Sequence, residues 1–132
     1  MNSIAINTSK RTEFVDITPR IEKFVKDSKI KDGLCVVFCP HTTAGLTINE
    51  NADPSVRKDI INHLEELVPE DKGYSHSEGN SDSHIKSSLL GSSLNIIIEN
   101  NSLALGTWQG IYFCEFDGQR QRNVYIKIIK NI

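Results

Sequence analysis

The sequence lacks long hydrophobic runs and blocks of like charge. No apolar stretch approaches the roughly 18 residues needed to cross a membrane. Residues 1–10 alternate apolar with polar side chains and do not form the continuous apolar core of a signal peptide. The 15 Lys and Arg and the 17 Asp and Glu residues are spread along the chain, whereas general nucleic-acid and anionic-membrane binders cluster their positive charge. We therefore expect a cytoplasmic protein with no nucleic-acid or membrane partner.

Cysteine is scarce as well, and the three cysteines cannot all pair. Cys35 and Cys39 lie in one predicted buried strand, where residues four apart are separated by about 13 Å. That separation is too large for a disulfide or a shared metal ion. We expect these two residues and Cys114 to be buried free thiols in a reducing compartment.

The chain of 132 residues is long enough for one domain, residues 1–132, and too short for two. Alternating apolar residues predict seven or eight strands, in neighbouring runs that helices interrupt. Two strand pairs are expected to be hairpins, one turning near Ser9-Lys10 and one at Asp117-Gly118. This pattern favours an α+β fold with a mainly antiparallel, curved sheet over a doubly wound fold.

Three helices and two loops organise the rest of the chain. Thr18 and Asp53, each followed by proline, have the features of helix caps, and a third helix is expected at residues 83–90. Residues 70–82 have no apolar periodicity and predict a surface loop, whose length favours a functional role. We expect this loop and the loop at residues 40–45 to build a functional site.

Three of the four histidines, His41, His76 and His84, lie in or beside these loops. Neutral imidazole is the commonest ligand for zinc-like ions, and a catalytic metal needs about three protein ligands. The spacing of the three residues matches no local metal motif. The sequence therefore leaves two interpretations, a shared metal site or separate capping and solvated histidines. His63, at the edge of the apolar face of the second helix, is expected to be structural.

Four charged residues have unusual positions. Glu50 is either a solvated acid or a ligand or general base, whereas Asp53 already has a structural role as a helix cap. Arg57 falls within the apolar arc of the second helix, one turn from its N-terminus, where it could pair with a buried acid or form a seat for phosphate or carboxylate. Glu115 lies on an apolar strand face. Glu115 and Arg57 could satisfy one another, or both could line a cavity.

Four segments stand out together: HTTAGLTINEN at 41–51, DPSVR at 53–57, SHIKSSLLG at 83–91 and GTWQG at 106–110. In this order they resemble the YjbQ family, also called the secondary thiamine-phosphate synthase family. The resemblance extends over nearly the whole chain. It implies a homotrimer with a mixed, mainly antiparallel β-sheet curved into a half-barrel or sandwich, on which two or three helices pack. It also implies a polar pocket near the subunit boundary.

The resemblance further implies which residues build the site. The residues with expected catalytic roles are Glu50, Asp53, Arg57, Lys86, Gln109 and Glu115. The residues expected to bind a metal ion are His41, His76 and His84, and Glu78 is expected to contact the substrate. We add Thr42, Thr43, Asn51 and Arg120 as candidates for substrate binding.

Family members are associated with a weak ability to join the phosphorylated thiazole and pyrophosphorylated pyrimidine halves of thiamine. Displacing pyrophosphate requires neutralisation of the leaving anion, which Arg57, Lys86 and Arg120 beside a divalent ion such as zinc could provide. The sequence has no Asp-rich Mg²⁺ motif and no Gly-rich phosphate loop. We expect a small trimeric, metal-assisted enzyme for phosphorylated small molecules. The alternative is a non-catalytic trimer that binds a metal or a metabolite.

Overall fold

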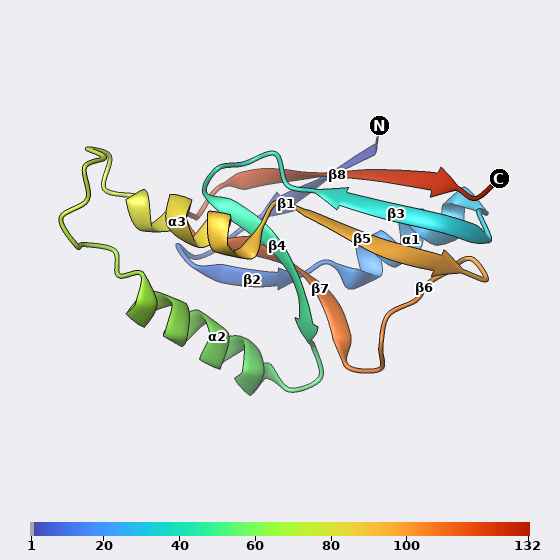
Figure 1. The fold of residues 1–132 in the computed structure, drawn as a ribbon, viewed down its shortest axis with the longest axis horizontal. Helices are drawn as coiled ribbons and strands as arrows, with labels where there is room; N and C mark the ends of the chain where they lie inside the picture. Colours follow the sequence, from blue (N-terminus) through green and yellow to red (C-terminus); the bar gives the residue numbers. More distant parts are fainter. Residues whose placement is uncertain (1) are drawn as a thin grey trace.

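The computed structural model describes residues 2–132 (Figure 1). In chain order the elements are β1 (Asn2–Asn7), β2 (Glu13–Asp16), α1 (Thr18–Ser28), β3 (Asp32–Phe38), β4 (Ala44–Glu50), α2 (Pro54–Leu67), α3 (Ser81–Leu90), β5 (Ser93–Glu99), β6 (Ser102–Leu103), β7 (Gln109–Glu115) and β8 (Gln121–Lys130). All strand pairings in this part of the chain are antiparallel. The predicted α+β fold is confirmed.

The strands form two sheets that share one core. The larger sheet has the order β1-β8-β3-β5-β6 and the smaller has the order β2-β7-β4. Val37 and Ile98 of the larger sheet pack in the same cluster as Leu46 and Phe113 of the smaller one, and all four are fully buried. The sheets curve around this core into a half-barrel. Figure 1 shows α2 and α3 together at one end of the molecule.

Both predicted hairpins are wrong, because the strands on either side of each turn enter different sheets. β1 pairs with β8, whereas β2 pairs with β7. The turn at Asp117-Gly118 likewise carries the chain from the smaller sheet to the larger one. The two turns pack on one another, since the Gly118 N–H donates to the carbonyl oxygen of Arg11 at 3.0 Å. A Cβ on Gly118 would overlap the carbonyl oxygen of Lys10, so glycine is required by this close approach.

One of the two predicted helix caps is confirmed. The Asp53 carboxylate accepts the N–H of Ser55 at 2.9 Å, as an N-cap does. At α1 the cap position is Ile17, one residue before the predicted one. Thr18 lies inside the helix, and its backbone N–H and its hydroxyl both donate to the carboxylate of Asp16. Asp16, which precedes the helix, therefore supplies the hydrogen-bond acceptor that was expected from Thr18.

The three cysteines are buried and free within residues 2–132, as predicted. Burial raises the pKa of Cys35 and of Cys39 to about 11. Burial also holds the pKa of Cys114 well above its usual value. These thiols are therefore protonated near neutral pH and behave as small core residues.

None of the helices in the described chain is long and apolar enough to cross a membrane.

Candidate functional site

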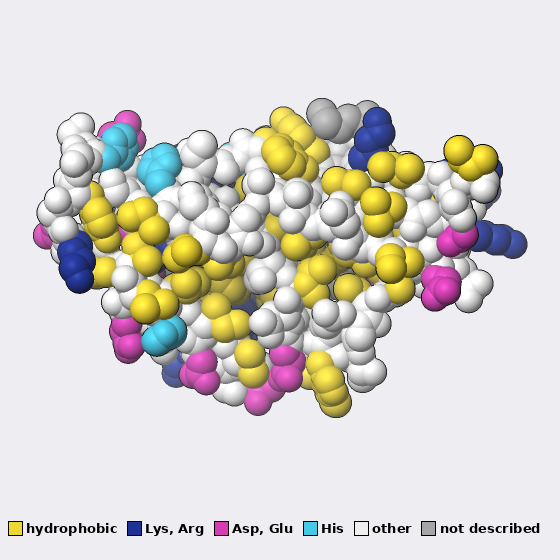
Figure 2. Space-filling model, in the orientation of Figure 1, with side chains coloured by type: hydrophobic (Ala, Val, Ile, Leu, Met, Phe, Trp, Pro, Cys, Tyr) yellow, Lys and Arg dark blue, Asp and Glu magenta, His cyan; other side chains and the backbone are white. Residues whose placement is uncertain are grey.

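A polar cavity of about 520 Å³ lies where three loops meet, and its size is that of a small-molecule site. The loops are the one before β4, the one before α3 and the turn between β7 and β8. The lining residues are Pro40, His41, Thr42, Thr43, His76, Glu78, Asn80, His84, Asp117, Arg120 and Arg122. We call it the histidine cavity, because all three predicted metal-binding histidines line it. Figure 2 shows two histidine side chains next to one another at the end of the molecule where α3 lies.

His76 and His84 form a close pair in this cavity. Their ring centroids are 5.4 Å apart and the rings are nearly perpendicular. Nε2 of His76 lies 3.8 Å from the Glu78 carboxylate. The loop before α3 and the first turn of α3 thus place two imidazoles side by side, and the Glu78 carboxylate lies next to the His76 ring.

His41 enters the cavity from the loop before β4. Burial and the nearby Arg122 guanidinium lower its pKa, so the ring is neutral near pH 7. Its Nε2 accepts the backbone N–H of Asn123 at 3.0 Å and lies 3.2 Å from the carbonyl oxygen of the same residue. Either neutral tautomer therefore finds a backbone partner at Nε2, and Nδ1 is left without one among residues 2–132. A histidine held in this way suits a metal ligand or a proton acceptor.

The donor set only partly fits a metal ion. Imidazole and carboxylate are the groups that a zinc-like ion prefers. Within the described chain, however, no three His, Cys, Asp or Glu side chains lie close enough together to hold one ion. His76 and His84 are the two potential ligands that lie side by side. A third ligand would have to move into place or come from a second copy of the chain.

Arg122 and Glu115 form a buried ion pair beneath the cavity. Nε of Arg122 donates to Glu115 Oε1 at 2.8 Å, and Nη2 donates to Glu115 Oε2 and to the Thr43 hydroxyl. Glu115 also accepts the Thr8 hydroxyl and the Asp117 N–H. Arg122 is 3% exposed, yet its Nη1 makes no hydrogen bond within residues 2–132. The pair therefore holds one guanidinium in a fixed position at the cavity, with donors to spare.

Burial alone would raise the pKa of Glu115. The hydrogen bonds from Arg122, the Asp117 N–H and Thr8 outweigh burial, so the pKa lies below its usual value. Glu115 is therefore ionised, and each of its carboxylate oxygens accepts two hydrogen bonds. The proposed pairing of Glu115 with Arg57 is wrong, because Arg122 takes that place.

Lys86 belongs to a second buried ionic cluster and does not line the cavity. Its Nζ lies 3.0 Å from Asp82 and 3.1 Å from Glu65. Arg11 donates to both carboxylate oxygens of Asp82 at 3.1 Å. Burial opposes ionisation of Asp82, but the bonds from Arg11 and Lys86 lower its pKa overall. This cluster ties α3 to α2 and to the turn between β1 and β2, so the structure gives Lys86 a supporting position.

Other predicted site residues lie on β4 and β7, at the end of these strands that is away from the histidine cavity. In the register of β4 and β7, Ala44 faces Glu115 and Glu50 faces Gln109. At about 3.3 Å per residue, Glu50 is roughly 20 Å from Ala44 and the cavity beside it. The Gln109 side chain accepts the Gly106 N–H at 2.8 Å.

Tyr112 connects this far end to α2. Its hydroxyl donates to the carbonyl oxygen of Glu50 at 3.0 Å, and the guanidinium of Arg57 lies 5.4 Å from its ring centroid. The side chain of Asn51 lies 3.4 Å from Asp16, also at this end. Within one chain, the predicted residues Glu50, Asn51 and Arg57 are thus separated from the histidines.

Three further polar residues line the cavity and were not predicted as site residues: Arg122, Asn80 and Asp117. Arg122 alternates with Val124 and Ile126 along β8, so its place on the buried face could have been read from the period of two. Asn80 donates to Asp117 at 2.9 Å across the cavity wall. No sequence signal links these two residues, which are 37 positions apart.

The comparisons with known proteins place the chain in a family. A family model described as UPF0047 protein YjbQ-like matches residues 2–131. The chain belongs to the YjbQ family. It is 60% identical over 124 residues to UPF0047 protein MJ1081 of Methanocaldococcus jannaschii, which covers 94% of this chain and 90% of that protein. It is 51% identical over 130 residues to UPF0047 protein YugU of Bacillus subtilis, with 98% of both chains covered.

Solved structures of the YjbQ family have the same fold. A crystal structure from Clostridium acetobutylicum superposes with a TM-score of 0.96 at 56% identity and covers 98% of this chain and 100% of that one. A YjbQ-like protein of Sulfolobus solfataricus gives a TM-score of 0.95 at 30% identity, with 98% and 96% covered. The family predicted from the sequence is therefore confirmed, together with its fold.

We predict that acid destabilises the fold through Asp82 and Glu115. Their folded-state pKa values lie below the values of about 4 in an unfolded chain. Their stabilisation is therefore complete above about pH 5 and is lost as the pH falls through the folded-state values. Urea titrations between about pH 3 and 7 should show a free energy of unfolding that falls on the acid side. Asp82→Asn should flatten this fall, whereas Asp59→Asn, at an exposed helix position, should not. An equally steep profile for Asp82→Asn would contradict the assignment.

Proposed function

We propose that this YjbQ-family chain is a metal-assisted enzyme that acts on a phosphorylated small molecule in the histidine cavity. One observation carries the proposal: three histidines and two arginines, from segments far apart in the sequence, line a single cavity of small-molecule size. Histidines supply metal ligands and proton acceptors, and arginines bind phosphate oxygens in pairs of hydrogen bonds. The combination suits phosphoryl or pyrophosphoryl groups.

His76 and His84 are the residues that would hold the ion. A bound divalent ion of the zinc type would polarise a phosphoryl oxygen and neutralise charge on a leaving phosphate. His41, when its Nε2–H donates to the Asn123 carbonyl oxygen, would supply the third ligand or accept a proton at Nδ1. These two roles of His41 exclude one another at any one moment.

The two arginines would bind the anionic part of the substrate. Arg122 is fixed by Glu115 and presents Nη1. Arg120 is held by Asp117, to which its Nε and Nη2 donate at 3.0 and 3.1 Å, and half of its side chain is exposed. Side chains that are already fixed lose little entropy when they bind an anion, so this arrangement favours tight binding.

The family resemblance suggests the first reaction to assay, the joining of the phosphorylated thiazole to the pyrophosphorylated pyrimidine half of thiamine. In that reaction a bond forms from the thiazole ring nitrogen to the methylene carbon of the pyrimidine. The bond from that carbon to oxygen breaks, and pyrophosphate leaves with the electron pair. The two arginines would bind the charge that the leaving group carries.

We also propose that the protein is a homotrimer. Leu34 faces Ile97 on one side and Ile129 on the other, which makes an apolar row across the outer face of the larger sheet. Ile97 is 62% exposed and Ile129 is 47% exposed, so association would remove them from water. Only a second copy could bring Glu50 to a histidine cavity, because within its own chain it lies at the far end of β4.

Sedimentation velocity should give about three times the chain mass of 14.8 kDa, and a monomer would contradict this proposal.

A non-catalytic binding trimer is the second candidate. The position of Glu50, the predicted general base, outside the cavity of its own chain favours it. The two candidates differ in one result. A ligand that raises the melting temperature and is recovered unchanged after long incubation supports the binder, whereas conversion of the ligand supports the enzyme.

We predict that metal binding depends on the cavity histidines. Protein purified without an affinity tag or chelator should contain close to one divalent ion per chain by elemental mass spectrometry. His84→Ala should remove most of this metal and any thiamine-phosphate synthase activity. His63→Ala is the matched control, because this exposed histidine lies on α2, outside the cavity. Full activity in metal-free His84→Ala would contradict a metal-assisted mechanism.

We predict that anion binding depends on Arg120. Arg120→Gln should weaken the binding of pyrophosphate, measured by isothermal titration calorimetry, by about tenfold, or about 1.4 kcal/mol. Arg20→Gln changes an exposed arginine on α1 that donates to the Ala5 carbonyl oxygen, and it should leave the affinity unchanged. Equal affinities in the two variants would show that pyrophosphate binds elsewhere.

A further inference from the structure

A second cavity, of about 500 Å³, lies between β2 and the N-terminal half of α2. Arg57, Lys58 and Ile61 line it from one face of α2, and Lys10 and Phe14 line it from the opposite wall. We call it the α2 cleft. It shares no lining residue with the histidine cavity.

The α2 cleft has an excess of positive charge. Lys10, Arg57 and Lys58 have no carboxylate within ion-pair distance among residues 2–132. The one acid in the lining, Glu13, accepts the backbone N–H and the hydroxyl of Ser9, each at 2.8 Å. Three cations and one acid give the lining of the cleft a net charge of +2.

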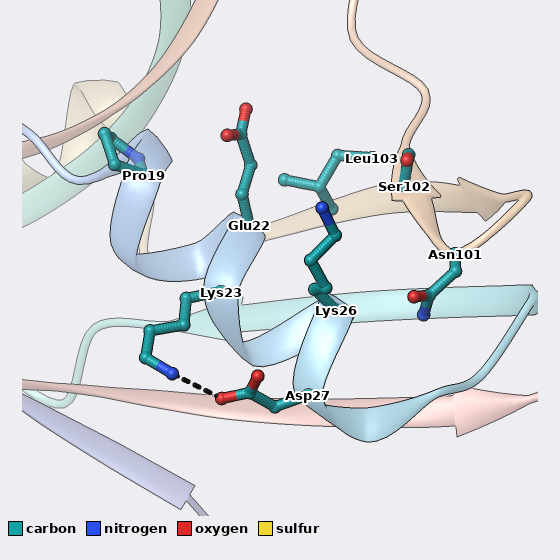
Figure 3. A pocket seen from close by; sticks show the side chains of 8 residues that line it. All are labelled: Pro19, Glu22, Lys23, Lys26, Asp27, Asn101, Ser102 and Leu103. Atoms are coloured by element: carbon teal, nitrogen blue, oxygen red, sulfur yellow. Dashed lines mark hydrogen bonds and ion pairs between the residues drawn. The ribbon is translucent and has the colours of Figure 1, made fainter.

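Another cavity of similar size shows that this excess is not general. The cavity of about 540 Å³ between α1 and β6 contains two lysines and two acids. Figure 3 shows Lys23 and Asp27 paired along α1, and their Nζ and carboxylate oxygen lie 2.7 Å apart. The charges of this cavity are balanced within the protein, whereas those of the α2 cleft are not.

Two contacts within the protein fix the side chain of Arg57. Its Nη1 donates to the Phe14 carbonyl oxygen at 3.1 Å, and its guanidinium lies 5.4 Å from the Tyr112 ring centroid. These contacts fix the side chain but leave Nε and Nη2 without a hydrogen bond in the described chain. Ile61 is half-buried beside it and provides an apolar surface in the same cleft.

We propose that the α2 cleft binds an organic anion, a carboxylate or phosphate group attached to an apolar body. The anionic group would bind the guanidinium of Arg57 and the ammonium group of Lys58, near the start of α2. The apolar body would lie against Phe14 and Ile61. This site is separate from the histidine cavity and does not depend on the proposed enzymatic function.

The test compares four probes on the full chain in low-salt buffer. The probes are 1-naphthyl phosphate, 1-naphthoate, the neutral 1-naphthalenemethanol and inorganic phosphate. At least one of the two aryl anions should bind once per chain, at least tenfold more tightly than the neutral alcohol and inorganic phosphate. The aryl anion that binds shows whether the site prefers phosphate or carboxylate. Failure of both aryl anions to bind at millimolar concentration would overturn the proposal.

Variants locate the binding. Arg57→Gln should weaken the aryl anion at least tenfold, and Lys58→Gln, at an exposed position, should weaken it about threefold even if Arg57→Gln fails to fold. Lys23→Gln removes a lysine from the charge-balanced cavity and should leave the affinity unchanged. His84→Ala should also leave it unchanged. Loss of binding in His84→Ala would place the anion in the histidine cavity and overturn this proposal, whatever the reaction proves to be.

Discussion

The buried ion pair between Glu115 and Arg122 joins the two sheets and sets the position of the histidine cavity. Glu115 ends β7 in the smaller sheet and Arg122 lies near the start of β8 in the larger one, so a side-chain contact connects strands that pair with different neighbours. Thr8 and Thr43 bring the ends of two further segments to the same pair. Removing one partner from a buried pair typically costs about 3–5 kcal/mol. The loops that carry the histidines therefore extend from a rigid base.

The two ends of the smaller sheet carry different groups of polar side chains. One end of β4 and β7 carries the ion pair and the histidine cavity, where metal ligands and arginines gather. The other end carries Glu50 and Tyr112, with Arg57 of α2 packed against the Tyr112 ring. Because the strands are rigid, Glu50 and the cavity histidines act together only if a second copy of the chain brings the two ends together. Assembly and chemistry are thus coupled in the proposed trimer.

The sequence predicted the elements of the fold better than their partners. Periodicity and proline-marked starts located the helices and strands, but the turn at Asp117-Gly118 encodes a reversal and not the strand that follows it. The family motifs named residues that the fold places at opposite ends of β4. The order of motifs along a sequence does not give the distances between their residues, so this separation could not be predicted. The role of Arg122 was available in its alternation with Val124, whereas its pairing with Glu115 depends on how the two sheets meet.

The four histidine side chains can be followed directly by NMR. Imidazole ¹H–¹⁵N spectra of the protein would be recorded while zinc, and then pyrophosphate, is added. We predict that the resonances of His41, His76 and His84 shift with zinc and shift again with pyrophosphate, while those of His63 stay in place. Shifts confined to His63, or no shift at any histidine, would contradict a metal and phosphate site in the histidine cavity.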